Sequence, residues 1–307
     1  MPLLPTSSLV ALTQSHRILC GATAILLPLS YVISLYLIPA RIRALPRDDP
    51  IHIFWRIGAV AAVTLLSPFA VFFLAPHDGP PLFDLLGMAP HCISPLLGFG
   101  PVILVAVLFA GPIVTAAASI IAQPPGDVLR TMYFYRPSVT TFRALVVAPV
   151  SEEVVFRAAA LPLLVAAGAS HSGALFASAA LFSVAHVHHY LDHKAQGLAH
   201  NVAVRIVAVQ LTFTGAFALL SAHAFLKSGS LVGIIVAHTL ANAMGPPDVS
   251  FWVSVRHPGH WARGLIAVAY VLGIFGFFWL LLTDNWLGLP HHRGGRKCAL
   301  SPSRSML

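Results

Sequence analysis

Long apolar stretches alternate with short polar segments along almost the whole of this chain. Stretches near the ~20 residues that a membrane-spanning helix needs recur eight times. The pattern predicts an all-α fold, a polytopic integral membrane protein with about eight transmembrane helices. We expect Pro101 and Pro112 to kink the third span. The predicted spans cover residues 18–40, 54–74, 94–122, 139–167, 172–189, 204–226, 230–244 and 265–283.

The polar segments between the spans are too short to fold by themselves. Residues 123–136 form an amphipathic connection, residues 188–201 a polar loop rich in histidine, and residues 284–307 a polar C-terminal tail. No internal repeat is visible in the sequence. We therefore interpret residues 1–307 as a single membrane domain.

Composition supports a membrane protein and argues against a soluble domain and against a nucleic-acid-binding protein. Hydrophobic residues make up 57% of the chain and charged residues 9%, whereas soluble domains carry roughly 25% charged residues. The basic residues behind the net charge of +8 are scattered at the ends of the apolar stretches and in the tail. Such positions suit anchors at lipid headgroups, so we predict a lipid bilayer and no nucleic acid as partner. The cysteines Cys20, Cys92 and Cys298 are too far apart to indicate a disulfide framework or a thiolate metal site.

The fourth predicted span contains three charged residues, Glu152, Glu153 and Arg157. Each charge near the centre of a bilayer costs at least ~2.5–3.5 kcal/mol, so the three together need a reason. Glu153 and Arg157, four residues apart, share a helix face and can pair, whereas Glu152 points elsewhere without an obvious local partner. This division suggests that one carboxylate is neutralised and the other serves a substrate or a water molecule. The alternative is an acid–base cluster that only locks helices together.

Two later spans carry polar pairs at the same four-residue spacing. Phe182 and His186 share one face of the fifth span, and the pair His238 and Asn242 shares one face of the seventh. A lone membrane histidine usually makes a hydrogen bond between helices, but repeated pairs favour a chemical role. The histidines at 188–189 lie at the end of a span, where interfacial histidines are ordinary.

These residue types are compatible with two kinds of hydrolytic site. In the first, Glu152 and His186 hold and deprotonate a water molecule. His238 and Asn242 then donate hydrogen bonds to the oxyanion that forms on an attacked carbonyl group. In the second, Glu152, His186 and His238 bind a metal ion that activates the water. The chain has no HExxH motif, no GxSxG motif and no pair of aspartates within the spans, so those protease classes are not predicted.

The three motifs, in this order and spacing, resemble those of a known family. Glu152-Glu153-x-x-x-Arg157, Phe182-x-x-x-His186 and His238-x-x-x-Asn242 are similar to the motifs of the type II CAAX prenyl endopeptidases. That family belongs to the glutamate-dependent membrane proteases related to abortive-infection proteins. The resemblance covers residues 139–248, which we expect to form the catalytic core. Further segments resemble the eukaryotic branch of the family: residues 157–162, 185–189, 210–217, 227–231 and 242–248.

The resemblance implies an activity, a location and roles for the site residues. Such enzymes are multi-pass proteins of the endoplasmic reticulum membrane that act on prenylated proteins ending in CaaX, among them small GTPases. They cleave the peptide bond after the prenylated cysteine and release the last three residues, without a cofactor. The implied site consists of Glu152 as general base, His186 beside the water, His238 and Asn242 at the oxyanion, and Glu153, Arg157 and Phe182 in support.

Two other functions are compatible with the sequence. A transporter or proton relay would also bury Glu152 and several histidines. Against it, no inverted repeat is visible, and an asparagine one turn from His238 suits carbonyl polarisation better than proton passage. A non-catalytic scaffold of the same superfamily would be expected to have lost part of the motif set, which here is intact.

We predict that the activity needs no metal ion. Asn242 is a poor ligand for zinc, and its place beside His238 suits an oxyanion donor better. Peptide cleavage by the purified protein should therefore survive treatment with a metal chelator. Loss of cleavage in the chelator, restored by stoichiometric zinc, would contradict this prediction.

Overall fold

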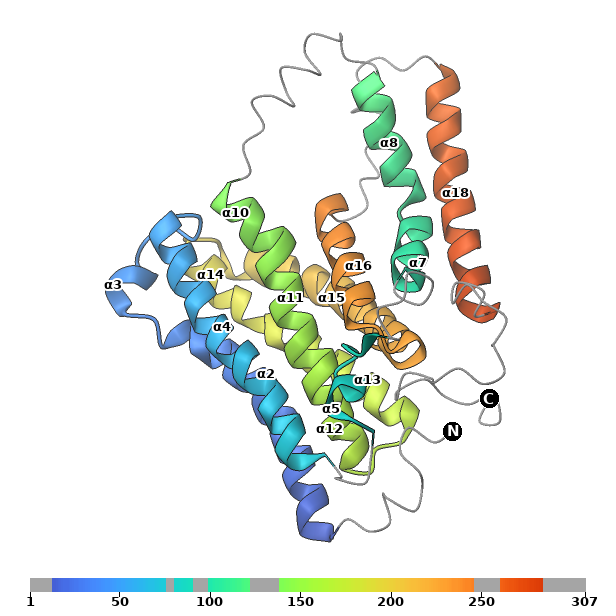
Figure 1. Ribbon diagram of the computed structural model, residues 1–307. Helices are drawn as coiled ribbons and strands as arrows, with labels where there is room; N and C mark the ends of the chain where they lie inside the picture. Colours follow the sequence, from blue (N-terminus) through green and yellow to red (C-terminus); the bar gives the residue numbers. More distant parts are fainter. Residues whose placement is uncertain (1–12, 76–79, 91–98, 122–137, 246–259, 284–307) are drawn as a thin grey trace.

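The computed structural model describes residues 13–75, 80–90, 99–121, 138–245 and 260–283. Within these ranges every regular element is a helix, and Figure 1 shows long helices packed side by side. The predicted all-α membrane architecture is confirmed. The predicted connection at 123–136 lies almost entirely outside the described residues, as does the tail at 284–307.

Five helices are long and apolar enough to cross a membrane, and a bent helix pair would make a sixth. The predicted count of about eight is not reached on length and composition alone, because the fourth predicted span consists of short segments and the seventh, α16 (Leu231–Met244), has 14 residues. The five are α2 (Gln14–Tyr36), α4 (Pro50–Leu74), the segment His171–Ala195, α15 (His200–Ser228) and Arg263–Thr283 within α18 (His260–Thr283). Two short helices, α3 (Ala40–Arg43) and α5 (Leu82–Leu85), lie on either side of α4 in the sequence.

The bent pair consists of α7 (Gly100–Leu108) and α8 (Ala110–Ile121), which meet at an angle of 70°. The predicted kink from Pro112 has a direct cause, since proline at this position cannot donate to the carbonyl of Leu108 and its ring crowds that carbonyl. Pro101 does not kink the span, because it lies in the first turn of α7, where backbone N–H groups lack helical partners anyway.

The histidine-rich segment is largely helical, so the loop predicted at residues 188–201 is wrong for most of its length. Helix α13 (His171–Ala185) continues through a short 3-10 turn, η4 (His186–His188), into α14 (His189–Ala195). Asp192 in the first turn and Lys194 in the last turn of α14 complement the helix dipole, which favours this polar segment as a helix.

A helical segment that alternates between α and π geometry runs through the middle of the molecule, beside α2 and α4 and beside α13 and α16 (Figure 1). Every residue from Val155 to Ala166 is buried, as expected for a helix that packs on all sides. Residues at its centre are therefore held by several neighbours at once. The segment consists of α10 (Val139–Phe142), η2 (Arg143–Val147), α11 (Ala148–Glu153), η3 (Val154–Ala160) and α12 (Leu161–Ala166).

Candidate active site

A fully buried ion pair lies at the centre of the site. Arg157 Nε is 3.3 Å from Glu153 Oε2, and neither side chain is exposed, so the pairing predicted from the four-residue spacing is present. The Arg157 guanidinium carbon also lies 4.2 Å from the centre of the Phe182 ring. Its Nη2 donates to the carbonyl of Ala218 at 3.5 Å. The cation is thus held by a carboxylate, an aromatic face and a backbone carbonyl.

The Glu153 carboxylate connects the central segment to two further helices. Ser221 of α15 donates its hydroxyl to Glu153 Oε2 at 2.8 Å. His238 of α16 approaches the other oxygen, with 2.7 Å between its Nδ1 and Glu153 Oε1. Because Glu153 is ionised in its pair with Arg157 and can then only accept, the Nδ1 atom of His238 carries the hydrogen of this bond.

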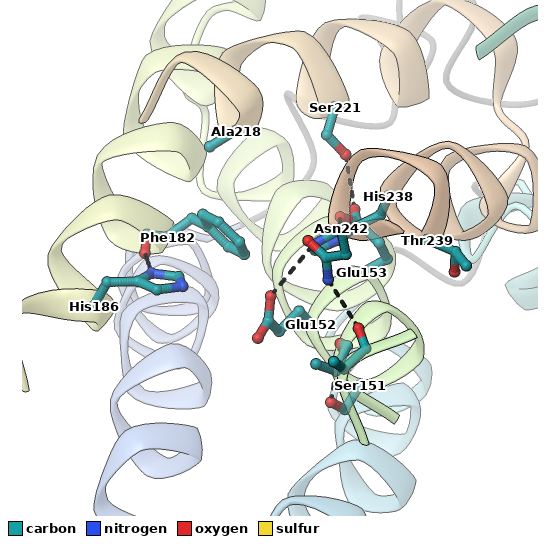
Figure 2. A network of polar contacts seen from close by, with 12 residues as sticks. Ser151, Glu152, Glu153, Phe182, His186, Ala218, Ser221, His238, Thr239 and Asn242 are labelled. Atoms are coloured by element: carbon teal, nitrogen blue, oxygen red, sulfur yellow. Dashed lines mark hydrogen bonds and ion pairs between the residues drawn. The ribbon is translucent and has the colours of Figure 1, made fainter. Parts of the chain in front are cut away.

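Glu152 has a different environment from its neighbour in the sequence. Its side chain is 17% exposed, and its Oε2 lies 3.8 Å from His238 Nε2. Glu152 and His186 line one cavity of about 120 Å³, which is room for a few water molecules. Figure 2 shows the Glu152 carboxylate between His186 on one side and His238 on the other. The ionisable partner of Glu152 is therefore His238 of α16, which local spacing in the sequence could not reveal.

The Phe182 and His186 pair supports the site from α13 and η4. His186 Nδ1 lies 2.8 Å from the carbonyl oxygen of Phe182, which can only accept, so Nδ1 donates. In the neutral ring Nε2 is then an unprotonated acceptor. The ring centres of Phe182 and His186 are 4.8 Å apart. Phe182 therefore contacts Arg157 and His186 at the same time, which explains its place in the motif.

The second pair, His238 and Asn242, occupies the last turns of α16. Because His238 Nδ1 donates to Glu153, its Nε2 can donate only when the ring is the doubly protonated imidazolium. Asn242 is exposed, and its amide donates to the carbonyl of Ala144 at 3.0 Å. Thr239 Oγ1 donates to the carbonyl of Leu145 at 2.8 Å. Both carbonyls belong to the π-helical η2, so π geometry, frequent at functional sites, helps to fix α16.

The described residues place a set of possible metal ligands beside the predicted site rather than within it. One donor atom each from His188, His189 and Asp192 lies within 4.8 Å of the others. Arg47 Nη1 is 3.3 Å from Asp192 and 3.2 Å from His189 Nδ1, so a guanidinium already provides positive charge there. The alternative ligand set of Glu152, His186 and His238 is not among the described groups spaced to hold an ion.

Several residues near the site lie outside the three motifs and were not predicted from the sequence. Ser221 and Phe217, whose ring centre is 4.6 Å from that of His238, lie one turn apart on α15. The hydroxyl of Tyr31 on α2 forms a 2.9 Å hydrogen bond with Ser151, next to Glu152. Three arginines also line the cavity of Glu152 and His186. They are Arg47, Arg56 and Arg143.

Known proteins resemble this chain along most of its length. Residues 135–244 match the model of a protein family described as type II CAAX prenyl endopeptidase Rce1-like. CAAX prenyl protease 2 of Homo sapiens is 32% identical over 269 residues, 82% of this chain and 77% of the human protein. The protein of the same name from Rattus norvegicus is 30% identical over 267 residues, 82% of this chain and 75% of the rat protein. The protein of the same name from Arabidopsis thaliana is 34% identical over 148 residues, which cover 47% of this chain and 44% of the Arabidopsis protein.

The chain belongs to the type II CAAX prenyl endopeptidase family. The family resemblance deduced from the three motifs is thereby confirmed, and the human and rat relatives are proteases. The alternative function of a transporter or proton relay finds no support in these comparisons. No solved structure matches the chain significantly.

The two adjacent glutamates should differ in their contribution to stability. Glu153→Ala leaves Arg157 charged and unpaired in the interior, which typically costs ~3–5 kcal/mol. Glu152→Ala removes a partly exposed side chain whose nearest ionisable partner is 3.8 Å away, so its effect should be small. Thermal unfolding of both variants in detergent tests this difference. Equal unfolding temperatures would contradict it.

Proposed function

We propose that this protein is an intramembrane endopeptidase that removes the C-terminal tripeptide from prenylated CaaX proteins. Family membership supports the reaction class, since the curated relatives are named CAAX prenyl proteases. The single observation that carries the assignment of residues is the cavity shared by Glu152 and His186. It joins a partly exposed carboxylate, 3.8 Å from its ionisable partner His238, to a histidine whose Nε2 is an acceptor.

The reaction begins with a water molecule held between Glu152 and His186. Glu152 takes a proton from this water, and the oxygen attacks the carbonyl carbon of the prenylated cysteine. The tetrahedral intermediate then collapses, the C–N bond breaks, and the protonated Glu152 returns the proton to the leaving amine. The products are a new carboxylate on the prenylated cysteine and a free tripeptide.

The oxyanion of that intermediate is stabilised by His238 and Asn242 in this proposal. Glu153 accepts from His238 Nδ1 at 2.7 Å and so orients the ring, whose Nε2 donates to the oxyanion in the doubly protonated form. The Asn242 amide uses one hydrogen for Ala144 and has a second to donate. Donors fixed before the reaction act strongly in a site of low dielectric constant.

The substrates and the location follow from the family in the same way. We propose that the substrates include prenylated small GTPases and that the protein resides in the endoplasmic reticulum membrane. A membrane enzyme is suited to such substrates, because their isoprenoid lies in the lipid while the tripeptide is polar. The candidate spans are consistent with a multi-pass protein.

Loss of the general base should abolish cleavage without unfolding the protein. Purified Glu152→Ala in detergent, incubated with a farnesylated CaaX peptide, should release tripeptide at a rate ~10²–10⁴-fold below that of the native protein. Its unfolding temperature serves as the control. Native turnover by this variant would remove Glu152 from the mechanism.

The oxyanion assignment predicts an electrostatic asymmetry at Asn242. Asn242→Ala should lower kcat by roughly 10²–10³, because one oxyanion donor is lost while peptide binding is retained. Asn242→Asp should be slower still, because a carboxylate repels the developing negative charge. Single-turnover cleavage is measured alongside binding of the farnesylated peptide. Equal rates for the two variants, or loss of binding in both, would show the assignment to be wrong.

A further inference from the structure

A cluster of three arginines lines the same cavity as Glu152 and His186, and the proposed mechanism gives it no role. Arg47 precedes α4, Arg56 lies in the second turn of α4, and Arg143 begins the π-helical η2. Two of the three residues therefore come from the start of α4 and the third from a distant segment, and all three line one cavity. We call these residues the arginine cluster.

The charges of the arginine cluster are only partly balanced. Arg47 pairs with Asp192 at 3.3 Å, and Arg143 pairs with Asp48 at 3.4 Å, although Asp48 is 72% exposed. Among the residues that the structure describes, Arg56 has no carboxylate within ion-pair distance. At longer range Asp192 attracts the Arg56 guanidinium, while both other arginines repel it.

An arginine in this position needs a compensating interaction. Arg56 belongs to the apolar helix α4, a candidate membrane span, in which it is the only lysine, arginine, aspartate or glutamate. Placing such a charge in a membrane helix is costly, and such residues commonly face a cavity and mark a binding site. Guanidinium groups bind carboxylates through paired, charge-assisted hydrogen bonds. The cluster thus has the chemistry of a site for an anion.

We propose that the arginine cluster binds the C-terminal carboxylate of the substrate, with Arg56 as the principal donor. The inference rests on the proposed function and adds to it a subsite that determines where the chain is cut. An enzyme that always removes three residues must measure the distance from the scissile bond to the chain end. A fixed cation at the correct distance from Glu152 provides that measure.

The spacing along the structure fits a tripeptide. Three extended residues span about 10 Å from the attacked carbonyl to the terminal carboxylate. Arg143 precedes Glu152 by nine residues on one helical segment, a rise of roughly 13 Å, which its long side chain can shorten. Tyr31, whose hydroxyl bonds with Ser151 next to Glu152, lines the cavity together with Arg56, so Arg56 belongs to the same neighbourhood.

The test compares two farnesylated CaaX peptides that differ only at the C-terminus, one with a free carboxylate and one with a carboxamide. The native protein should cleave the carboxylate peptide with a kcat/KM roughly 10–100-fold above that of the amide, mainly through KM. Arg56→Gln should lower kcat/KM far more for the carboxylate peptide than for the amide peptide, so that the two values converge. Arg56→Lys should restore part of the preference.

A matched control is Arg41→Gln, which removes one positive charge from α3, at an exposed residue that does not line the cavity. It should keep the full preference of the native protein. If Arg56→Gln lowers kcat/KM equally for both peptides, Arg56 serves folding or binds lipid headgroups, and the inference is overturned. If Arg56→Gln cleaves neither peptide, the same comparison is made with Arg143→Gln. The inference then stands only if Arg143→Gln shows a smaller preference for the carboxylate peptide over the amide peptide than the native protein does.

Failure of the inference is distinguishable from failure of the proposed function. Equal cleavage of carboxylate and amide peptides by the native protein would overturn the carboxylate subsite and leave the endopeptidase intact. Cleavage of neither peptide by the native protein would overturn the endopeptidase function, and the subsite with it.

Discussion

The buried ion pair between Glu153 and Arg157 is the interaction on which the rest of the site depends. Both side chains are withdrawn from water, so each requires the other, and removing one leaves a charge in the interior. The remaining contacts of the pair recruit other helices. Phe182 covers the guanidinium from α13, while Ser221 and His238 approach the carboxylate from α15 and α16. One local pair thus fixes the mutual positions of three helices.

In this arrangement the two adjacent carboxylates have different roles, Glu153 a structural one and Glu152 the reactive one. Glu153 is buried and held by Arg157, Ser221 and His238, whereas Glu152 is partly exposed to a cavity. His238 touches both, with its Nδ1 toward Glu153 and its Nε2 toward Glu152. The structural carboxylate therefore orients the ring that faces the reactive one and fixes Nδ1 as its donor, as outer partners do for active-site histidines in general.

Sequence reasoning identified the interactions that are local in the chain and missed those that are not. The i, i+4 pairs Glu153–Arg157 and Phe182–His186 follow from helical periodicity, and both are present. The contact of Glu152 with His238, by contrast, joins residues 86 positions apart and depends on how α16 packs. Arg56 carries the same signal as Glu152, a charge within an apolar span, but the general interpretation of basic residues as headgroup anchors did not single it out.

The most direct test of the central claim is a double-mutant cycle on the buried pair, read out as thermal unfolding in detergent. Glu153→Gln and Arg157→Met should each destabilise strongly, while the double variant should unfold at or above the temperature of the worse single variant, because no unpaired charge remains. The pair Arg143–Asp48, whose carboxylate is exposed, should show additive and small effects on unfolding when replaced in the same way. Additive losses at Glu153 and Arg157 would contradict the account, because the pair would then not be the interaction that holds the site together.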